Sequence, residues 1–316
     1  MPVKPAAPPP PIRSHRPPHA LLRTEIAVPF LLVALIWGST WLVIKDQLAA
    51  APPSWSVTYR FAIAAVGMGA LALFRRESLR LTAAGHLFAL MIGVTQFFAN
   101  FNFVYRAELY LTSGIVAVLF GLLMIPNAIL GRIFLGQQVT PRLLIGGLIG
   151  LAGIAALLIN EAQNAPFSAE VALGAAYTMI AIIACSCANI AQATEQAQRV
   201  PIVSLLTWAM VWGTLVDAAF AWTLDGPPVV PVSLRYWGGV AYLGLVGSVL
   251  AFPLYYTLVR KLGAGRAAYN SVVVPVVAMA LSTMFEGYRW STLALAGAAL
   301  ALGGMVIALR ARHPVK

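Results

Sequence analysis

The sequence predicts an all-α integral membrane protein, in which ten transmembrane helices form two inverted five-helix repeats around a central cavity. Three observations predict it: the composition, ten long apolar runs, and a similarity between the two halves of the chain. Of the 316 residues, 60% are hydrophobic and 10% are charged, and the mean hydropathy is +0.83. Soluble domains are about 45–50% apolar and about 25% charged. The composition therefore excludes a soluble enzyme and a nucleic-acid-binding module, because too few charged side chains are available to cover a surface facing water.

Each apolar run is long enough to be a membrane helix, which needs roughly 20 apolar residues to cross about 30 Å of hydrocarbon. The predicted spans are 27–45, 54–74, 84–105, 111–131, 143–160, 170–192, 203–224, 236–258, 265–285 and 292–310. Residues 1–26 are rich in proline and arginine without a signal-peptide core, so we expect a disordered cytoplasmic tail. The expected domains are the repeats 27–160 and 170–310, followed by a second cytoplasmic tail at 311–316.

Basic residues predict the orientation, because lysine and arginine are retained on the cytoplasmic side during insertion. With the N-terminus inside, the outer segments hold four of them: Lys45, Arg106, Arg235 and Arg289. The inner segments and tails hold Lys4, Arg13, Arg16, Arg23, Arg75, Arg76, Arg80, Arg132, Arg142, Arg199, Arg260, Lys261, Arg266, Arg310, Arg312 and Lys316. Both termini are therefore expected to be cytoplasmic, in a membrane of the bacterial inner-membrane type.

The two halves resemble each other near their ends. Pro126 aligns with Pro275 and Gln137 with Glu286, and a glycine-rich span follows each pair. Because five spans per half is an odd number, the second copy must be inverted in the membrane, which is a common architecture of secondary transporters. The glycine-rich spans predict close helix packing. Proline kinks a helix, so the matched Pro126 and Pro275 are candidate gating hinges, with static kinks as the alternative.

These residues carry a family resemblance over about 27–310. The motifs are ALIWGSTWLVIK in the first span, PPSWSVTYRF in the second, and the paired proline, acidic turn and glycine-rich endings. The chain resembles the ten-helix EamA-type exporters of the drug/metabolite transporter superfamily, although Gln137 stands where that family typically has glutamate. The resemblance implies a basket of ten helices around a central cavity that exports amino acids or other small metabolites.

Two charged residues, Arg60 and Asp217, lie inside spans, where a charge is costly. They occupy equivalent helices of the two repeats at similar depth, so we hypothesise that they form a buried charge pair or that both line an outward-facing cavity. An ion pair that only holds two helices together is an equal alternative. A role for Asp217 as proton carrier is less favoured, because a nearby arginine would keep it ionised.

Amides and aromatic residues inside the spans are the candidate substrate-binding groups. Amides must face other helices or a cavity, because lipid cannot satisfy them, and amides beside aromatic rings suit the polar head and apolar side chain of an amino acid. For Asn102 a hydrogen bond between helices is the favoured interpretation, and an aromatic stripe is more often packing than a ligand site. The candidates are Trp37, Trp41, Gln96, Asn100, Asn189, Asn270 and Tyr256.

The expected function is export of small metabolites, amino acids first and aromatic ones among them, by alternating access. The rival is a proton-coupled exporter of drugs or organic cations, in which Asp217 would attract the cation. An enzyme would need a nucleophile with a base or paired carboxylates. A channel would need a ring of like groups.

The expected partners are a small-molecule substrate and the lipid bilayer. No nucleic acid, nucleotide, metal or other cofactor is expected, since the sequence has no phosphate-binding loop motif, and Cys185 and Cys187 are too few for a metal site.

Overall fold

The computed structural model describes residues 24–137, 141–164, 169–262, 264–267, 270–287 and 289–309. The last three residues of the predicted tail 1–26 belong to the first helix, and the tail 311–316 lies outside the described residues. The first half contains α1 (Thr24–Gln47), α2 (Pro53–Phe74), α3 (Ala83–Ile92), η2 (Gly93–Asn100), α4 (Phe101–Tyr110), α5 (Ser113–Phe120), η3 (Gly121–Leu123), α6 (Met124–Leu135) and α7 (Pro141–Asn164). The second half contains α8 (Ala169–Gln192), α9 (Glu195–Gln198), α10 (Ile202–Asp225), α11 (Leu234–Ala241), η4 (Tyr242–Leu250), α12 (Ala251–Leu262), α13 (Ala264–Ala267), α14 (Asn270–Phe285) and α15 (Thr292–Leu309).

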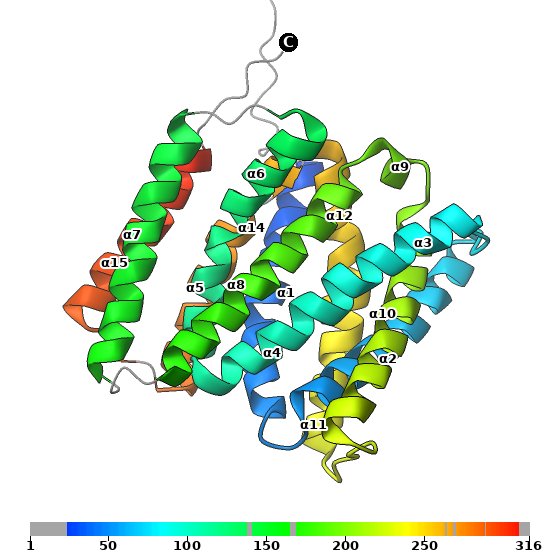
Figure 1. Ribbon diagram of the computed structural model, residues 1–316, viewed down its shortest axis with the longest axis horizontal. Coiled ribbons are helices and arrows are strands. Elements are labelled where there is room, and N and C mark those ends of the chain that lie inside the picture. Colours follow the sequence, from blue (N-terminus) through cyan, green and yellow to red (C-terminus); the bar gives the residue numbers. More distant parts are fainter. Residues whose placement is uncertain are drawn as a thin grey trace, which may run out of the picture.

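The helices form one bundle of membrane-spanning elements (Figure 1). Within the described residues, seven helical segments are long and apolar enough to cross a membrane, and three shorter apolar helices cover 144–157, 273–285 and 292–304. Together they correspond to the ten predicted spans, so the predicted fold class is confirmed. The chain is a multi-pass membrane protein.

Local sequence signals set the ends of several helices. Pro53 begins α2, where the missing N–H of proline costs nothing. The side chain of Thr82 accepts from the backbone N–H of Gly85 and caps α3, and that of Ser233 accepts from Tyr236 and caps α11. Gly136 ends α6 with φ +64°, a left-handed conformation that glycine adopts without strain.

The two halves share an unusual feature in their third spans. The first passes from α3 through the π-helix η2 into α4, and the second passes from α11 through the π-helix η4 into α12. A π-helix has wider turns than an α-helix, so it changes the direction in which the following side chains point. The two π-helices lie against equivalent partners, since η2 packs on α10 and η4 packs on α2.

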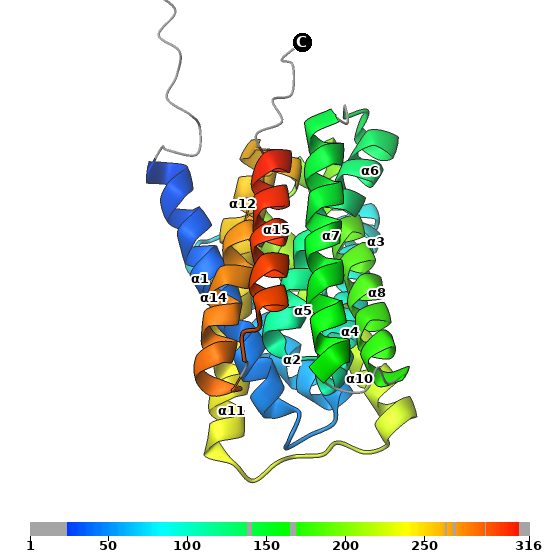
Figure 2. The same ribbon diagram turned by 90° about the vertical axis from the view of Figure 1, so that its left-hand side faces the viewer.

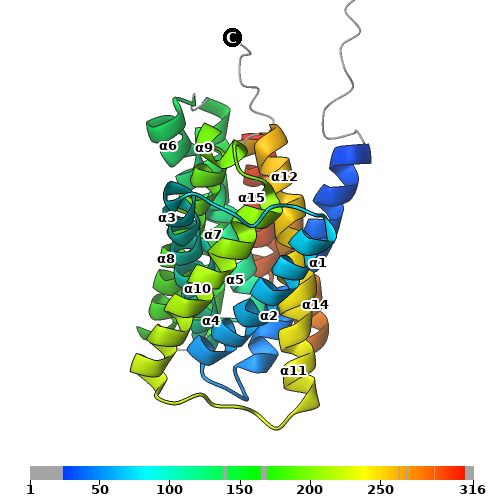
Figure 3. The ribbon, with the colours of Figure 1, turned by 90° about the vertical axis from the view of Figure 1, so that its right-hand side faces the viewer.

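The packing of the other helices also follows the repeat. α7 packs along α15, α2 along α10, and α1 along α14, so each pair joins one helix from each half (Figures 2 and 3). α1 begins and α15 ends at the same end of the bundle (Figure 2). We call this the proximal end, and the opposite end, where α1 reaches Gln47, the distal end.

Candidate transport site

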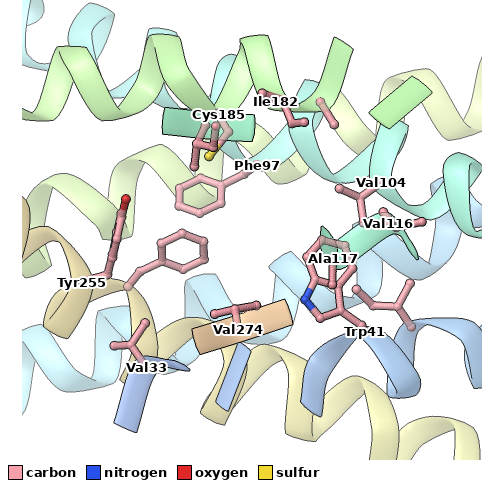
Figure 4. Close-up of a cluster of buried hydrophobic side chains, with 14 of the residues drawn as sticks. Val33, Trp41, Phe97, Val104, Val116, Ala117, Ile182, Cys185, Tyr255 and Val274 are labelled. Atoms are coloured by element: carbon pink, nitrogen blue, oxygen red, sulfur yellow. The ribbon is translucent and has the colours of Figure 1, made fainter. Parts of the chain in front are cut away.

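A central cavity lies between the two halves. About 770 Å³ between its lining side chains is occupied by no protein atom, open solvent at its mouth included. Side chains from both repeats surround it, and Figure 4 shows Trp41, Val104, Cys185, Tyr255 and Val274 around this space. The lining residues used below are Trp37, Trp41, Arg60, Gln96, Asn100, Phe120, Cys185, Asn189, Phe252, Tyr255, Asn270 and Pro275.

Arg60 is the only charged side chain among the described residues that line the cavity. It is 1% exposed, its Nε donates to Ser248 Oγ (3.3 Å), and its guanidinium carbon lies 4.2 Å from the centroid of the Phe101 ring. The cation–π contact offsets part of the cost of burying the charge. The Nη1 atom has no hydrogen-bond partner among the described protein groups. A buried guanidinium with a free N–H at a cavity is suited to bind an anion, carboxylate above all.

The ion pair predicted between Arg60 and Asp217 is not formed, and this prediction is corrected. Asp217 is fully buried in α10, does not line the cavity, and accepts a hydrogen bond at Oδ1 from Asn102 Nδ2 (2.6 Å). Arg106 donates from Nη1 to Asn102 Oδ1 (2.9 Å). Asn102 therefore joins Arg106 to the carboxyl group of Asp217 between α4 and α10, and the prediction that Asn102 bonds between helices is confirmed. The ion pair found within the described ranges is the exposed one between Arg235 and Asp46 (2.6 Å).

Amide side chains supply the other polar groups of the cavity. Asn270 donates from Nδ2 to Phe30 O (2.7 Å), and Asn189 from Nδ2 to Cys185 Sγ (3.8 Å). The Oδ1 atoms of Asn100 and Asn270 are buried without a hydrogen-bond partner among the described groups. A buried acceptor without a partner costs about 1–3 kcal/mol. These oxygens are therefore suited to accept N–H bonds from a ligand.

Aromatic rings complete the cavity wall. The Trp37 ring centroid lies 4.8 Å from that of Tyr255 and 5.3 Å from that of Phe252, and Trp37 Nε1 donates to Gly247 O (3.2 Å). The centroid of the Trp41 ring, on α1, lies 5.2 Å from that of Phe120, on α5. Rings held in this way provide rigid apolar surface for a planar or bulky ligand side chain.

Among the predicted binding residues, Trp37, Trp41, Gln96, Asn100, Asn189 and Asn270 lie on the cavity wall. Tyr256 does not, and its predicted place at the site is corrected. It is fully buried behind the wall, where its hydroxyl donates to Gln96 Oε1 (3.1 Å), and its neighbour Tyr255 faces the cavity instead. The reason is the π-helix η4, which precedes α12 and changes the face on which its side chains lie.

Several features of the site were missed in the sequence. The sequence gives no signal that Phe120 lines the cavity. It predicts Arg106 in an outer segment, whereas α4 extends to Tyr110 and holds Arg106 partly buried. The two hinge candidates differ in position, since Pro275 lines the cavity and Pro126 lies in α6 away from it. Cys185 lines the cavity and Cys187 is exposed, and both are free thiols.

The chain is similar to transporters of known sequence. A profile of the EamA-like transporter family matches residues 26–159 and again residues 172–310. A probable amino-acid metabolite efflux pump of Escherichia coli strain K12 is 26% identical, over 90% of this chain and 96% of that protein. The uncharacterized inner membrane transporter YedA of the same strain is 28% identical, over 87% and 86%. A crystal structure with 21% identity has the same fold, with a TM-score of 0.70 over 89% of this chain and 95% of that one. With both halves matched by the family profile, the chain belongs to the EamA-like transporter family.

Proposed function

We propose that this chain is a secondary transporter of the bacterial inner membrane that exports amino acids, those with aromatic or large apolar side chains in particular. The observation that carries the proposal is Arg60. It is a buried guanidinium at the cavity, with a free Nη1 atom and no acid within ion-pair distance among the described residues. Such a group favours a ligand that brings its own negative charge.

The remaining groups of the cavity match the rest of an amino acid. The substrate carboxylate binds the free edge of the Arg60 guanidinium, and its ammonium group donates to the unpartnered oxygens of Asn100 and Asn270. The apolar side chain lies among Trp37, Phe252 and the rings near them. A zwitterion thus satisfies polar atoms of both signs that have no partner among the described protein groups.

The relatives support the same class of substrate. The Escherichia coli protein that matches nearly the full chain is named a probable amino-acid metabolite efflux pump, and the second Escherichia coli relative is named an inner membrane transporter. The excess of lysine and arginine in the inner segments supports cytoplasmic termini, which makes the proximal end cytoplasmic and the distal end external.

The mechanism we propose is alternating access. The substrate enters from the cytoplasm, and the two inverted halves exchange conformations to open the cavity at the distal end. Pro275 lies on the cavity wall within α14, and Pro126 occupies the matching helix of the other repeat. These two residues are the proposed hinges, because each lacks the N–H that would hold its helix straight.

An exporter of organic cations is disfavoured by the same geometry. Such a site needs a carboxylate that is free to attract the cation. Asp217 is bonded to Asn102 away from the cavity, and the charge on the cavity wall is positive.

The test is flux of tryptophan, phenylalanine, threonine and methyl viologen in proteoliposomes that contain the full chain, with and without a pH gradient. We expect tryptophan and phenylalanine to be transported faster than threonine, and methyl viologen no faster than in protein-free liposomes. The matched control is Arg235→Gln, which removes an arginine exposed at the surface and leaves the cavity unchanged. Transport of methyl viologen without amino-acid transport would contradict the proposal.

A further inference from the structure

A second polar cluster lies at the distal side of the cavity, next to Trp41. We call Glu108, Ser113 and Glu286 the distal cluster. Glu108 is in the last turn of α4, Ser113 begins α5, and Glu286 directly follows α14. The Ser113 hydroxyl oxygen lies 3.0 Å from Glu108 Oε2, 2.9 Å from Glu286 Oε1 and 3.2 Å from the backbone oxygen of Trp41. The cluster therefore joins the first repeat to the second.

The number of hydrogen atoms in this cluster does not match the number of acceptors. A serine hydroxyl has one hydrogen to donate, and an ionised carboxylate has none. With both glutamates ionised, one of the two carboxylate contacts of Ser113 would bring oxygen lone pairs together without a hydrogen between them. One added proton removes the conflict between the carboxyl groups, because the protonated one then donates to Ser113 Oγ and Ser113 donates to the other. The Trp41 oxygen then remains as the third and longest of the Ser113 contacts.

The surroundings do not supply a countercharge in direct contact. Glu108 is fully buried and its Oε1 has no partner among the described groups. Lys45 of α1 donates to the backbone oxygens of Glu108 and Leu111, not to the carboxylates. Arg60 of α2 bonds Ser248, and the Tyr105 hydroxyl donates to Gln47. A buried carboxylate without an ion-pair partner is costly, which favours the neutral form of one glutamate.

A further buried hydroxyl from the second repeat faces the same place. Ser282 of α14 is 1% exposed, and its Oγ has no hydrogen-bond partner within the described ranges. A Cβ atom built on Gly114, the residue after Ser113, would lie 3.3 Å from that oxygen. The interface between α5 and α14 thus holds an unpartnered hydroxyl group next to the residue that follows Ser113.

We propose that the distal cluster binds one proton, held by the buried Glu108 carboxyl group and linked through Ser113 to Glu286, and that this proton holds the distal end of the cavity closed. The bridge spans α5 and α14, which pack against each other from opposite repeats, so the distal end cannot open there without breaking it. Loss of the proton to water leaves two carboxylates facing one hydroxyl and favours separation. The inference goes beyond the proposed function, because it does not depend on which molecule is carried.

The test measures the distance between two spin labels on the full chain in lipid nanodiscs, across a pH series and without substrate. The labels are placed by Ala172→Cys on α8 and Met284→Cys on α14, both exposed positions toward the distal end, after Cys185→Ser and Cys187→Ser. α8 packs on α4, so this distance reports separation of the two sides of the distal cluster. We expect one short distance at acid pH and a growing longer component as the pH rises.

Glu108→Gln and Glu286→Gln are the decisive variants. The glutamine amide donates to Ser113 Oγ as a protonated glutamate would, so each variant is expected to keep the short distance at every pH. The matched control is Asp46→Asn, which neutralises a carboxylate at the same end but outside the cluster and is expected to keep the pH response. A distance in the unsubstituted chain that does not change with pH would overturn the proposal, as would a normal pH response in either glutamine variant. Since no substrate is present, failure here is distinct from failure of the amino-acid flux experiment.

Discussion

The Nδ2 atom of Asn102, on α4, lies 2.6 Å from Oδ1 of Asp217, on α10. Asn102 also accepts at Oδ1 from Arg106 Nη1, and Arg106 in turn donates from Nη2 to Ser54 Oγ (2.7 Å). This chain of contacts connects three helices near the distal end. It gives Asp217 Oδ1 a donor inside α10 without a direct ion pair, whereas Oδ2 is buried without a partner among the described groups.

Asp217→Asn is therefore expected to transport amino acids at close to the wild-type rate, because asparagine keeps an oxygen that accepts from Asn102. Asn102→Leu is expected to lower the free energy of unfolding by about 1–3 kcal/mol, since it leaves the buried carboxylate without its donor. Both expectations are checked by measuring amino-acid flux and thermal unfolding for each variant. Loss of transport in a fully folded Asp217→Asn protein would make Asp217 a proton carrier and refute a structural role.

The neighbours Tyr255 and Tyr256 allow a matched comparison of cavity and core. Tyr255→Phe and Tyr255→Ala both change the cavity wall. The alanine variant is expected to raise the KM for tryptophan, and the phenylalanine variant is expected to raise this KM much less. Tyr256→Phe leaves the buried Gln96 Oε1 without its donor and is expected to cost about 1–3 kcal/mol of stability, with KM unchanged. If Tyr256→Phe raised KM at unchanged stability, the assignment of the two faces of α12 would be wrong.

Helices α7 and α15 pack through glycines at close range. A Cβ atom on Gly304 would lie 2.3 Å from the backbone N of Gly150, whereas one on Gly303 would meet no atom within 4 Å. Gly304→Leu is expected to lower the melting temperature strongly, because backbone cannot move aside, and Gly303→Leu is expected to leave it nearly unchanged. Equal melting temperatures for the two variants would mean that this contact does not stabilise the bundle.

The spans were predictable because membrane helices are defined by their length and apolar composition, and both properties follow directly from the amino-acid sequence. The cavity wall was partly predictable for a related reason. Amides such as Asn100, Asn189 and Asn270 cannot face lipid, so they had to face the interior.

The partners of the buried charges could not be predicted in this way. Arg60 and Asp217 match in depth and in repeat position, but pairing depends on how each helix is rotated about its axis. In the third span of each half, the π-helices η2 and η4 also change the face on which the following side chains lie, and no pattern of apolar residues predicted them. For the same reason Tyr255 rather than Tyr256 faces the cavity. The distal cluster was missed because it joins Glu108 to Glu286, which lie far apart in the sequence at the ends of different spans.

The central claim is that Arg60 binds the carboxylate of the substrate. It is tested most directly by comparing tryptophan with tryptamine, which lacks the carboxylate, in wild-type protein and in Arg60→Gln and Arg60→Lys. Hydrogen bonds to a charged group contribute about 1.5–3 kcal/mol, so Arg60→Gln should reduce tryptophan flux at low concentration by roughly 10- to 100-fold. Arg60→Lys should have an intermediate effect, because it keeps the charge and loses the fork geometry, and tryptamine should discriminate little between the three proteins. Unchanged tryptophan flux in a folded Arg60→Gln protein, or equal losses for both compounds, would contradict the account.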